Sequence, residues 1–426
     1  MKTILHLLTL SSAFQGTTEE AIRRNHSELL KALDEAFDVR ILTEEHFTAL
    51  HLESSDIVLV FIASGGTEGL FIKHYARMPK PLTLLTDGQA NSLAASLEIS
   101  SWVRAHNETC RILHNDPEQV VEAIHALHLR SLMQGQRLGI LGEPSVWLVS
   151  SHVDYEAATR RWGTTFVRIP LFRVENYFFA PESEEGAEAE AEAFIAGAGK
   201  MVEPSKAEVI KAVRLYHAIR RIVDEEKLDA ITVRCFDLIS SCHTTGCLAL
   251  ALLNNEGIIA GCEGDVPSLF TMLLGKRLTQ SDAFMANPAR IRDKEVLFAH
   301  CTIGLKQTRQ YIIRSHFESG TGVAIQGLMR EHRPVTVVKI GGEDLGRIAF
   351  ASAILAENKN DPKRCRTQIL LRTKNADLTH YLMNRSIGNH HVVLQGNCTE
   401  LFDHLSQAMD LHNEVTPAYT FASGRS

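Results

Sequence analysis

The chain has 426 residues, which is too long for a single hydrophobic core and predicts about two or three domains. A hydrophobic fraction of 45% and a charged fraction of 22% are typical of a folded globular protein and exclude wholesale disorder. The formal net charge of −7 provides no overall positive field for a phosphate backbone or an anionic lipid surface, so we expect no nucleic acid partner and no membrane partner.

The start of the chain, residues 1–13, can be mistaken for a secretory signal because Lys2 precedes an apolar run. We interpret this run as a buried strand, since polar residues interrupt it and residues 17–20 (TTEE) have the pattern that opens a helix. The eight cysteines are spread along the chain, without the density of a disulfide scaffold, which is typical of reduced thiols. We therefore expect a cytoplasmic protein.

Residues 1–138 are predicted to form an N-terminal α/β domain. Short β-branched runs alternate there with amphipathic helices, which is the pattern of a parallel sheet covered by helices. Asp116 followed by Pro117 predicts the start of a helix that continues to about residue 133. The expected strands span residues 3–10, 39–42, 56–63, 82–86 and 109–113.

Residues 139–293 are predicted to form a central α/β domain that carries Glu263. Ser205 and Glu208 have the spacing of a capping box that opens a long helix. An acidic, alanine-rich stretch at residues 181–199 is interpreted as a solvated helix or a flexible insertion. Further expected elements are strands at residues 139–141, 230–235 and 258–262 and helices at residues 245–254 and 266–274.

Residues 294–426 are predicted to form a C-terminal domain of closely spaced strands, which favours an antiparallel barrel or sandwich. The predicted fold class is therefore α/β, with two doubly wound parallel-sheet domains followed by a barrel-like, β-rich domain. The expected elements are strands at residues 295–301, 311–317, 322–325, 335–340 and 347–353, a helix at residues 399–412, and a tail without periodicity at residues 416–426.

Two carboxylates, Glu263 and Asp265, lie in the segment GCEGDVPS at residues 261–268, between a predicted buried strand and a predicted helix. Ligands gather at the carboxyl ends of strands in α/β sheets, so Glu263 is the leading candidate for a functional residue. Asp265 taken alone is better explained as the N-cap of the following helix.

Three further segments supply potential metal ligands. A carboxylate, an amide oxygen and imidazoles are a plausible ligand set for Mn²⁺ or a similar ion with open positions. Adjacent residues of a strand point to opposite faces, so at most one of two adjacent histidines readily enters a given site. The candidates are Asn287 in AFMANP, His300 in VLFAHC, and His390 and His391 in GNHHV.

The combination of these segments resembles the L-fucose isomerase and L-arabinose isomerase superfamily, and most closely its shorter L-fucose isomerase-like proteins. The resemblance covers nearly the whole chain, and the combined spacing is far more specific than any one tetrapeptide. Its further motifs are SGGTE (64–68), NSLA (91–94), GEPSVW (142–147), RCFDL (234–238), TTGCLA (244–249) and HFESG (316–320).

The resemblance implies a site in which Mn²⁺ is held by a Glu, a second carboxylate and histidine, and in which the carboxylates move protons between sugar C1 and C2. The first Glu matches Glu263, and the histidines match His300 and either His390 or His391. The second carboxylate matches Asn287, which is a departure, because an amide cannot accept a proton as a base. The candidates for a replacement proton shuttle are Asp265 and Glu318.

Other residues are candidates for contacts with the sugar. His316 and Glu318, two residues apart on a predicted strand, share a face and could hold sugar hydroxyls or relay a proton; a surface cross-strand pair is the alternative. Trp147 could stack on a sugar ring. Superfamily members form trimers or hexamers in which a neighbouring subunit completes the pocket, so the resemblance implies a homo-oligomer. The residues that it places against substrate from the adjacent subunit are Glu68, Asn91 and Ser92.

We therefore expect an enzyme, an intramolecular oxidoreductase, that interconverts an aldose and a ketose through an enediol. Its expected cofactor is Mn²⁺ or another divalent cation, and its expected partner is a small-molecule sugar. Two alternatives stay open: an isomerase or epimerase of a modified hexose, such as a sulfonated one, and a non-catalytic sugar-binding protein on the same scaffold. Hydroxyl stereochemistry is read by pocket shape, so the sequence does not specify the sugar.

Overall fold

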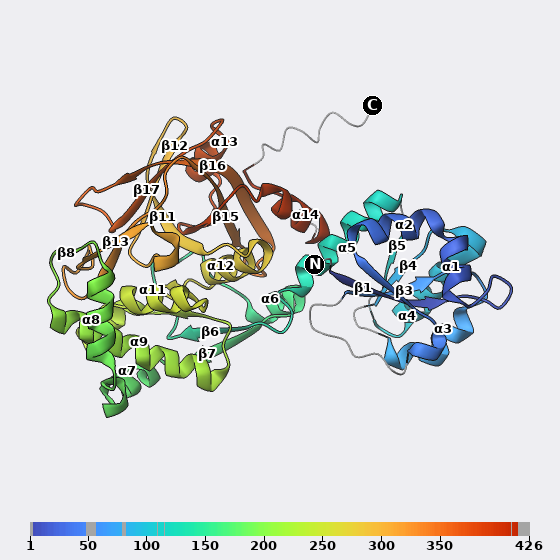
Figure 1. The fold of residues 1–426 in the computed structure, drawn as a ribbon, viewed down its shortest axis with the longest axis horizontal. Helices are drawn as coiled ribbons and strands as arrows, with labels where there is room; N and C mark the ends of the chain where they lie inside the picture. Colours follow the sequence, from blue (N-terminus) through green and yellow to red (C-terminus); the bar gives the residue numbers. More distant parts are fainter. Residues whose placement is uncertain are drawn as a thin grey trace. The chain divides into compact units, whose positions relative to one another are not determined.

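The computed structural model describes residues 3–47, 57–78, 82–108, 110–114, 116–409 and 411–415 (Figure 1). The chain divides into two compact units, residues 1–131 and 132–426. The predicted tail at residues 416–426 lies outside the described residues, and so do residues 56 and 109, each the first residue of a predicted strand.

The first unit is a parallel sheet with helices on both faces (Figure 1). Its strands are β1 (Ile4–Leu10), β2 (Asp38–Leu42), β3 (Ile57–Ile62), β4 (Leu82–Leu85) and β5 (Cys110–Leu113). Its helices are α1 (Glu19–Asn25), α2 (Ser27–Ala36), α3 (Glu68–His74), α4 (Ser92–Ala105) and α5 (Pro117–Ser131), with 3₁₀ turns η1 (Glu44–His46), η2 (Tyr75–Arg77) and η3 (Gln89–Asn91). The strand order is β2-β1-β3-β4-β5.

Two core clusters show why this unit is doubly wound. Leu5 and Leu7 of β1 pack with α2 and α5, whereas Leu8 and Leu10 pack with α3 and α4. A central parallel strand is buried on both faces, so its residues are apolar without alternation. The predicted parallel α/β arrangement is confirmed. α1 begins after Thr18, whose side chain accepts a hydrogen bond from the backbone N–H of residue 21.

The second unit contains a second parallel sheet, with strand order β10-β9-β6-β7 for β6 (Arg137–Leu141), β7 (Thr165–Ile169), β9 (Ala230–Val233) and β10 (Ile259–Cys262). Its helices up to this point are α6 (Tyr155–Trp162), α7 (Phe172–Phe179), η4 (Pro181–Ser183), α8 (Ala187–Gly197), α9 (Lys206–Glu226), α10 (Cys235–Ser241), α11 (Cys247–Glu256) and α12 (Val266–Thr279).

The capping box predicted for α9 is confirmed, because the Ser205 side chain accepts from the N–H of Glu208 and the Glu208 side chain accepts from the N–H of Ser205. The acidic stretch before it forms α8, which is a packed helix and not a flexible insertion. Ala187, Ala191 and Phe194 bury one face of α8 in the core, while its glutamates stay at the surface.

The C-terminal part forms a closed antiparallel barrel with strand order β11-β12-β17-β16-β15-β18, so the predicted barrel-like fold is confirmed. Alternate residues of each strand fill the interior, for example Val296 and Phe298. The strands are β11 (Ala283–Arg292), β12 (Glu295–His300), β15 (Arg333–Gly341), β16 (Arg347–Lys359), β17 (Thr367–Arg372) and β18 (His391–Gln395), accompanied by η5 (Leu305–Gln307), α13 (Asp377–Asn384) and α14 (Thr399–Met409).

Two of the strands predicted for this part lie outside the barrel. β13 (Gln310–Arg314) and β14 (Ala324–Leu328) form a separate small sheet with β8 (Lys200–Met201). The sequence pattern also does not identify β11, because Asn287 and Pro288 interrupt it. The pairing of β11 shifts register between Pro288 and Arg290, at a bulge, where a proline without an N–H is tolerated.

α12 joins the parallel sheet to the barrel. It packs against β9 and β10 and also against β11, β15 and β18. All its residues from Val266 to Gly275 are buried, as expected for a helix surrounded by protein. The turn that carries Glu263 leads directly into this helix, so α12 fixes that turn between the two layers.

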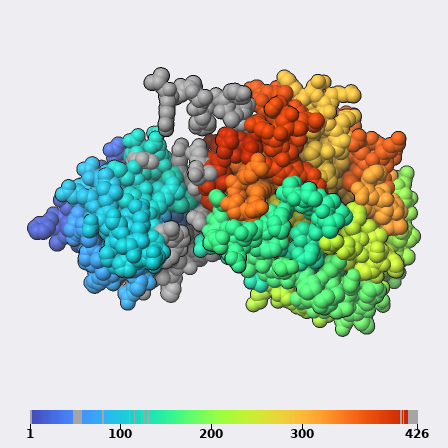
Figure 2. All heavy atoms as spheres, turned by 180° about the vertical axis from the view of Figure 1, so that it is seen from behind, coloured from blue at the N-terminus to red at the C-terminus, as the bar shows by residue number. Residues whose placement is uncertain are grey.

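The predicted domain boundary at residues 293 and 294 falls in the turn between the paired strands β11 and β12. The division of residues 139–426 into two domains stays a prediction. On the face of the second unit seen in Figure 2, the late strands and α14 (orange to red) form a continuous surface beside the green residues of the sheet layer. Within the described ranges, no helix has both the length and the apolar character that crossing a membrane requires.

Candidate functional site

Glu263 lies in a constrained turn at the carboxyl end of β10. Its backbone φ is +63°, and Gly264 follows at +70°. A left-handed conformation is uncommon for a residue with a side chain and is often found at functional sites. A Cβ on Gly264 would lie 2.8 Å from Pro144 Cα, so only glycine fits there. A hydrogen bond of 2.9 Å from Ser145 N to Glu263 O further fixes the turn.

The Glu263 carboxylate contacts residues from two distant segments. Trp147 Nε1 donates a hydrogen bond of 2.6 Å to Oε2, and His390 Nε2 lies 3.6 Å from Oε1. The Trp147 ring packs edge-on against Phe236, with centroids 5.1 Å apart. Trp147 therefore holds Glu263 in place. The Trp147 side chain is still 49% exposed, which leaves surface for a sugar ring, and stacking on a sugar stays a prediction.

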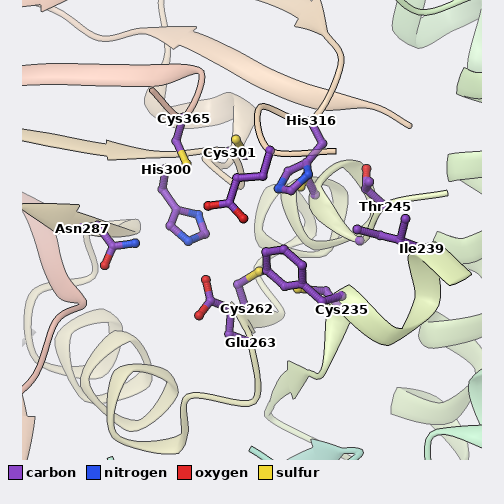
Figure 3. Close-up of a pocket in the computed structure, with 14 residues that line it drawn as sticks. Cys235, Ile239, Thr245, Cys262, Glu263, Asn287, His300, Cys301, His316 and Cys365 are labelled. Carbon is purple, nitrogen blue, oxygen red and sulfur yellow. The ribbon is translucent and has the colours of Figure 1, made fainter. Parts of the chain in front are cut away.

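Glu263, His300 and His390 form a group that can hold a metal ion. One ligand atom from each residue lies within 4.8 Å of the other two. His300 ends β12 and His390 immediately precedes β18, so the group joins the parallel sheet to the barrel. Figure 3 shows the Glu263 carboxylate and the His300 ring facing one another, with Asn287 beside them.

The hydrogen bonds around the two imidazoles fit metal binding. His390 Nε2 is buried without a hydrogen-bond partner in the described part of the chain, which is costly unless a ligand completes it. Its Nδ1 pairs with Asp265 Oδ2 at 2.9 Å, and His300 Nδ1 pairs with Thr302 Oγ1 at 3.0 Å. Metal-binding histidines are oriented in this way, with one nitrogen held by the protein and the other presented to the ion.

Asp265 supports this group and does not line the pocket. Its buried Oδ1 accepts from Ser268 N at 2.8 Å, which makes Asp265 the N-cap of α12, as predicted. Its Oδ2 pairs with His390 and lies 3.7 Å from the ammonium of Lys339. Lys339 is itself fully buried and donates to Ser268 Oγ at 2.9 Å. The Asp265 carboxylate is therefore fully engaged and is not free to shuttle protons on a sugar.

Burial and neighbouring charges set the protonation of the group. Burial raises the pKa of Glu263, but the nearby positive charge of His390 and the hydrogen bond from Trp147 outweigh it and lower the pKa to about 2. Burial lowers the pKa of His390, but the hydrogen bond to Asp265 and the negative charges of Asp265 and Glu263 outweigh it and raise the pKa to about 9. Burial and the charge on His390 lower the pKa of His300 to about 4. Near neutral pH, only His390 carries a proton that a metal must displace.

Metal binding is expected to release about one proton near neutral pH, since His390 has to lose its Nε2 proton while Glu263 and His300 are already in their ligand forms. Because the pKa of His390 is about 9, the apparent affinity rises with pH up to that value, by roughly tenfold per pH unit. Calorimetric titration with Mn²⁺ in two buffers of different ionisation enthalpy measures the release. A heat independent of the buffer would contradict this arrangement.

A pocket adjoins the group, lined by residues of both the parallel-sheet layer and the barrel. Among the described residues that line it there is no lysine or arginine. The pocket brings together the predicted site residues Glu263, Asn287, His300, His316 and Glu318.

The strand predicted for His316 and Glu318 is wrong. β13 ends at Arg314, and the following residues form a turn in which Gly320 N donates to His316 O at 2.9 Å. Gly320 has a φ of +66°, a left-handed conformation that ends an extended segment. Both predicted side chains nevertheless line the pocket, and His316 Nδ1 pairs with Ser319 Oγ at 3.0 Å.

His391 does not join the metal-binding group. Its Nε2 pairs with the Tyr381 hydroxyl at 3.1 Å, and its ring lies 6.2 Å from that of Phe298. Burial lowers the pKa of His391 to about 3, so it is neutral in this apolar setting. The two adjacent histidines face opposite ways, and it is His390 that meets Glu263.

Three predicted substrate residues lie in the first unit. Glu68 is the first residue of α3, and Asn91, with a φ of +60°, precedes α4. Ser92 is fully buried, and its hydroxyl accepts a hydrogen bond of 2.7 Å from Thr86, so it stabilises the loop. Contact of these residues with a sugar on an adjacent subunit stays a prediction.

The chain is distantly similar to sulfoquinovose isomerases. Those of Priestia aryabhattai and Priestia megaterium are each 21% identical to it over 345 residues, which cover 76% of this chain and 76% of each relative. The sulfoquinovose isomerase of a Clostridium species is 33% identical over 92 residues, or 21% of each chain. No family model matches the chain. Distant homologues of this chain are therefore sugar isomerases.

Five cysteines in the pocket wall were not foreseen from the sequence. They come from separate elements, and the sulfurs of Cys235 and Cys262 lie 3.1 Å apart. No regular spacing relates them along the chain, so no sequence pattern signals their convergence. No cysteine in the described part of the chain forms a disulfide. The five that line the pocket are Cys235, Cys247, Cys262, Cys301 and Cys365.

Proposed function

We propose that the chain is a metal-dependent isomerase that interconverts the aldose and ketose forms of a sulfonated hexose, with Mn²⁺ as the metal. The observation that carries the proposal is that Glu263, His300 and His390 converge beside a pocket. Glu318 also lines this pocket. The distant similarity to sulfoquinovose isomerases supports the substrate class. It favours a sulfonated hexose over the unmodified monosaccharide that we expect first from the sequence.

The reaction requires a group that moves a proton between C2 and C1 of the sugar. A base has to take the proton from C2 of the aldose and, as an acid, return it at C1 of the enediol. We assign this role to Glu318, which lines the pocket and has no hydrogen-bond or ion-pair partner among the described residues. Asn287, at the position that matches a carboxylate in the superfamily, has no basic oxygen for this step.

The remaining site residues bind the cation, position its ligands or contact the sugar. Glu263, His300 and His390 would hold the cation, which supplies Lewis-acid stabilisation of the negative charge that develops on the sugar oxygens. Trp147 fixes the carboxylate of Glu263 through its indole N–H. His316, held by Ser319 through Nδ1, has its second nitrogen available for a sugar hydroxyl.

A sulfonate needs a cationic partner, which the described pocket wall lacks. Arg234 directly precedes two lining residues, and its guanidinium donates to Asp237 Oδ2 at 2.8 Å and to Pro144 O at 3.2 Å. It also lines a second cavity of about 870 Å³ together with Arg168. We assign the sulfonate to Arg234, whose Nη2 takes part in neither of these two contacts and can donate a charge-assisted hydrogen bond to a sulfonate oxygen.

Arg234→Gln is expected to raise KM for the sulfonated hexose by about tenfold, since one charge-assisted contact is lost, and to leave KM for the unsulfonated hexose unchanged. Lys374→Gln, at an exposed lysine, is the matched control. Steady-state kinetics with both sugars make the comparison. An equal rise for the two sugars would show that Arg234 supports the pocket wall and does not bind the sulfonate.

Product NMR tests the proposed reaction. The protein is stripped of metal with a chelator and incubated with sulfoquinovose or unsulfonated aldoses, before and after addition of Mn²⁺. We expect a ketose from sulfoquinovose only after the metal is restored, and slower conversion of the unsulfonated sugars. If no aldose is converted in the presence of Mn²⁺, the proposal is wrong.

Asn287 gives one observation in favour of a different class of function, a sugar-binding protein that has lost catalysis. Replacement of a carboxylate by an amide at this position removes a base but keeps a polar oxygen for binding. Calorimetry with the same sugars separates the two readings, since saturable binding without conversion supports the binding protein.

A further inference from the structure

A separate cavity lies at the opposite end of the barrel from the metal-binding group. Gln395 and Gly396, at the end of β18, line it, and its open volume is about 910 Å³. His390 precedes the first residue of the same strand. A strand of five residues at about 3.4 Å per residue places the two sites roughly 17 Å apart. The cavity is therefore distinct from the proposed isomerase pocket.

Three cationic side chains surround this cavity: Lys306 from η5, Arg330 from the turn between β14 and β15, and Arg333, the first residue of β15. Across the described chain, none of the three has an ion-pair or side-chain hydrogen-bond partner, and no described lining residue is acidic. Glu331 lies between the arginines in sequence, but its Oε1 accepts from Asn358 N and Nδ2 at 2.9 Å each. Unopposed positive charges around one hollow attract an anion.

The floor of the cavity adds a buried polar group. Gln307 is only 3% exposed, and its Nε2 donates to Ala283 O at 3.1 Å. Its Oε1 is buried without a hydrogen-bond partner among the described residues, although native buried polar atoms are nearly always paired. A hydroxyl of a bound molecule would satisfy this oxygen. The apolar part of the floor consists of Met329, Val335 and Leu355, all buried.

We propose that this cavity binds a small phosphorylated molecule, with its phosphoryl group held by Lys306, Arg330 and Arg333 and a hydroxyl group at Gln307. A phosphate monoester carries about −1.5 to −2 charges near neutral pH, which matches three cations better than a singly charged sulfonate does. Arginine binds phosphoryl oxygens in pairs through its planar fork. The proposal does not depend on the isomerase activity, because no residue of the other pocket takes part.

Calorimetric titration of the full chain with inorganic pyrophosphate tests this site. We expect saturable binding of one molecule per chain, weakened at least tenfold in Arg330→Gln/Arg333→Gln. The matched control is Lys31→Gln/Lys374→Gln, which removes the same charge from exposed positions elsewhere. All four residues are exposed, so the variants keep the fold, and thermal unfolding verifies it. No saturable binding, or equal weakening in the control, would overturn the proposal.

Two further probes identify the chemical class of the ligand. Inorganic phosphate should compete with pyrophosphate, and methanesulfonate at the same ionic strength should bind at least tenfold more weakly than phosphate. Constant ionic strength is needed because salt screens exposed charges. Equal affinity for phosphate and methanesulfonate would overturn the assignment to a phosphoryl group.

Discussion

Replacing Glu318 by Gln is expected to lower kcat by about 100- to 10,000-fold, the usual contribution of a general acid–base group, and to leave metal affinity unchanged. Gln keeps the size and polarity of the side chain but can neither accept nor return a proton. Glu318 is not part of the group that can hold the cation, so the cation should bind as before. Steady-state kinetics with the sulfonated hexose and calorimetric titration with Mn²⁺ measure the two effects.

Two matched variants sharpen the comparison. Glu185→Gln changes an exposed glutamate on the surface before α8 and should leave kcat unchanged. Glu263→Gln should lower kcat and metal affinity together, because it removes an ionised ligand. If Glu318→Gln retains more than a tenth of the parent kcat, the proton passes through another group and the assignment fails.

Lys339→Met is expected to lower the free energy of unfolding by about 1–3 kcal/mol, less than the roughly 3–5 kcal/mol of a fully broken buried ion pair, because Asp265 keeps His390 as a partner. The ammonium of Lys339 and the carboxylate of Asp265 are both fully buried and 3.7 Å apart. Burial lowers the pKa of Lys339, and the negative charge of Asp265 opposes this by holding the proton. Met has a similar volume, so the substitution mainly removes the charge. Urea unfolding of the metal-free protein measures the change in the free energy of unfolding.

The double variant Lys339→Met/Asp265→Asn distinguishes the loss of a charge from the loss of packing. Asn keeps an oxygen for Ser268 N but carries no charge, so the buried site again becomes electrically balanced. The double variant should therefore be more stable than Lys339→Met by at least about 1 kcal/mol, a positive coupling between neighbours. If the second change adds further destabilisation, the ion pair is not what Lys339 contributes.

The parts of the fold that follow from local sequence could be predicted. The apolar runs of β1 and β3 indicate strands buried on both faces, and Ser205 with Glu208 marks the start of α9. α11 ends at Glu256, and Gly257 follows with a φ of +96°, the left-handed conformation in which a glycine commonly stops a helix. Each of these signals acts within a few residues, which is why the sequence reveals it.

The barrel depends on contacts that no local pattern encodes. Ala283 of β11 pairs with Leu394 of β18, more than 100 residues later in the chain. The same long-range pairing decides which of the two adjacent histidines meets Glu263, since His391 opposite residue 286 is buried near Tyr381. The buried Lys339 also escapes prediction, because an isolated lysine in an apolar strand gives no sign of its partner Asp265.

The candidate site could be predicted in part. The motif resemblance brought Glu263, His300 and the histidine pair into one hypothesis, and the structure places Glu263, His300 and His390 together. The resemblance could not show that the Asp265 carboxylate caps α12 and pairs with His390. These contacts leave Glu318 as the carboxylate in the pocket without a partner among the described residues. Only the structure distinguishes Asp265 from Glu318, since both are simply carboxylates in the sequence.

Hydrogen exchange with solvent tests the central claim most directly. In D₂O with sulfoquinovose and Mn²⁺, NMR of the recovered aldose should show deuterium at C2, and metal removal or Glu263→Gln should abolish it. Deuterium at C2 that persists after complete removal of metal, or sugar that binds for hours with C2 unlabelled, would contradict an enediol reaction at this cation site.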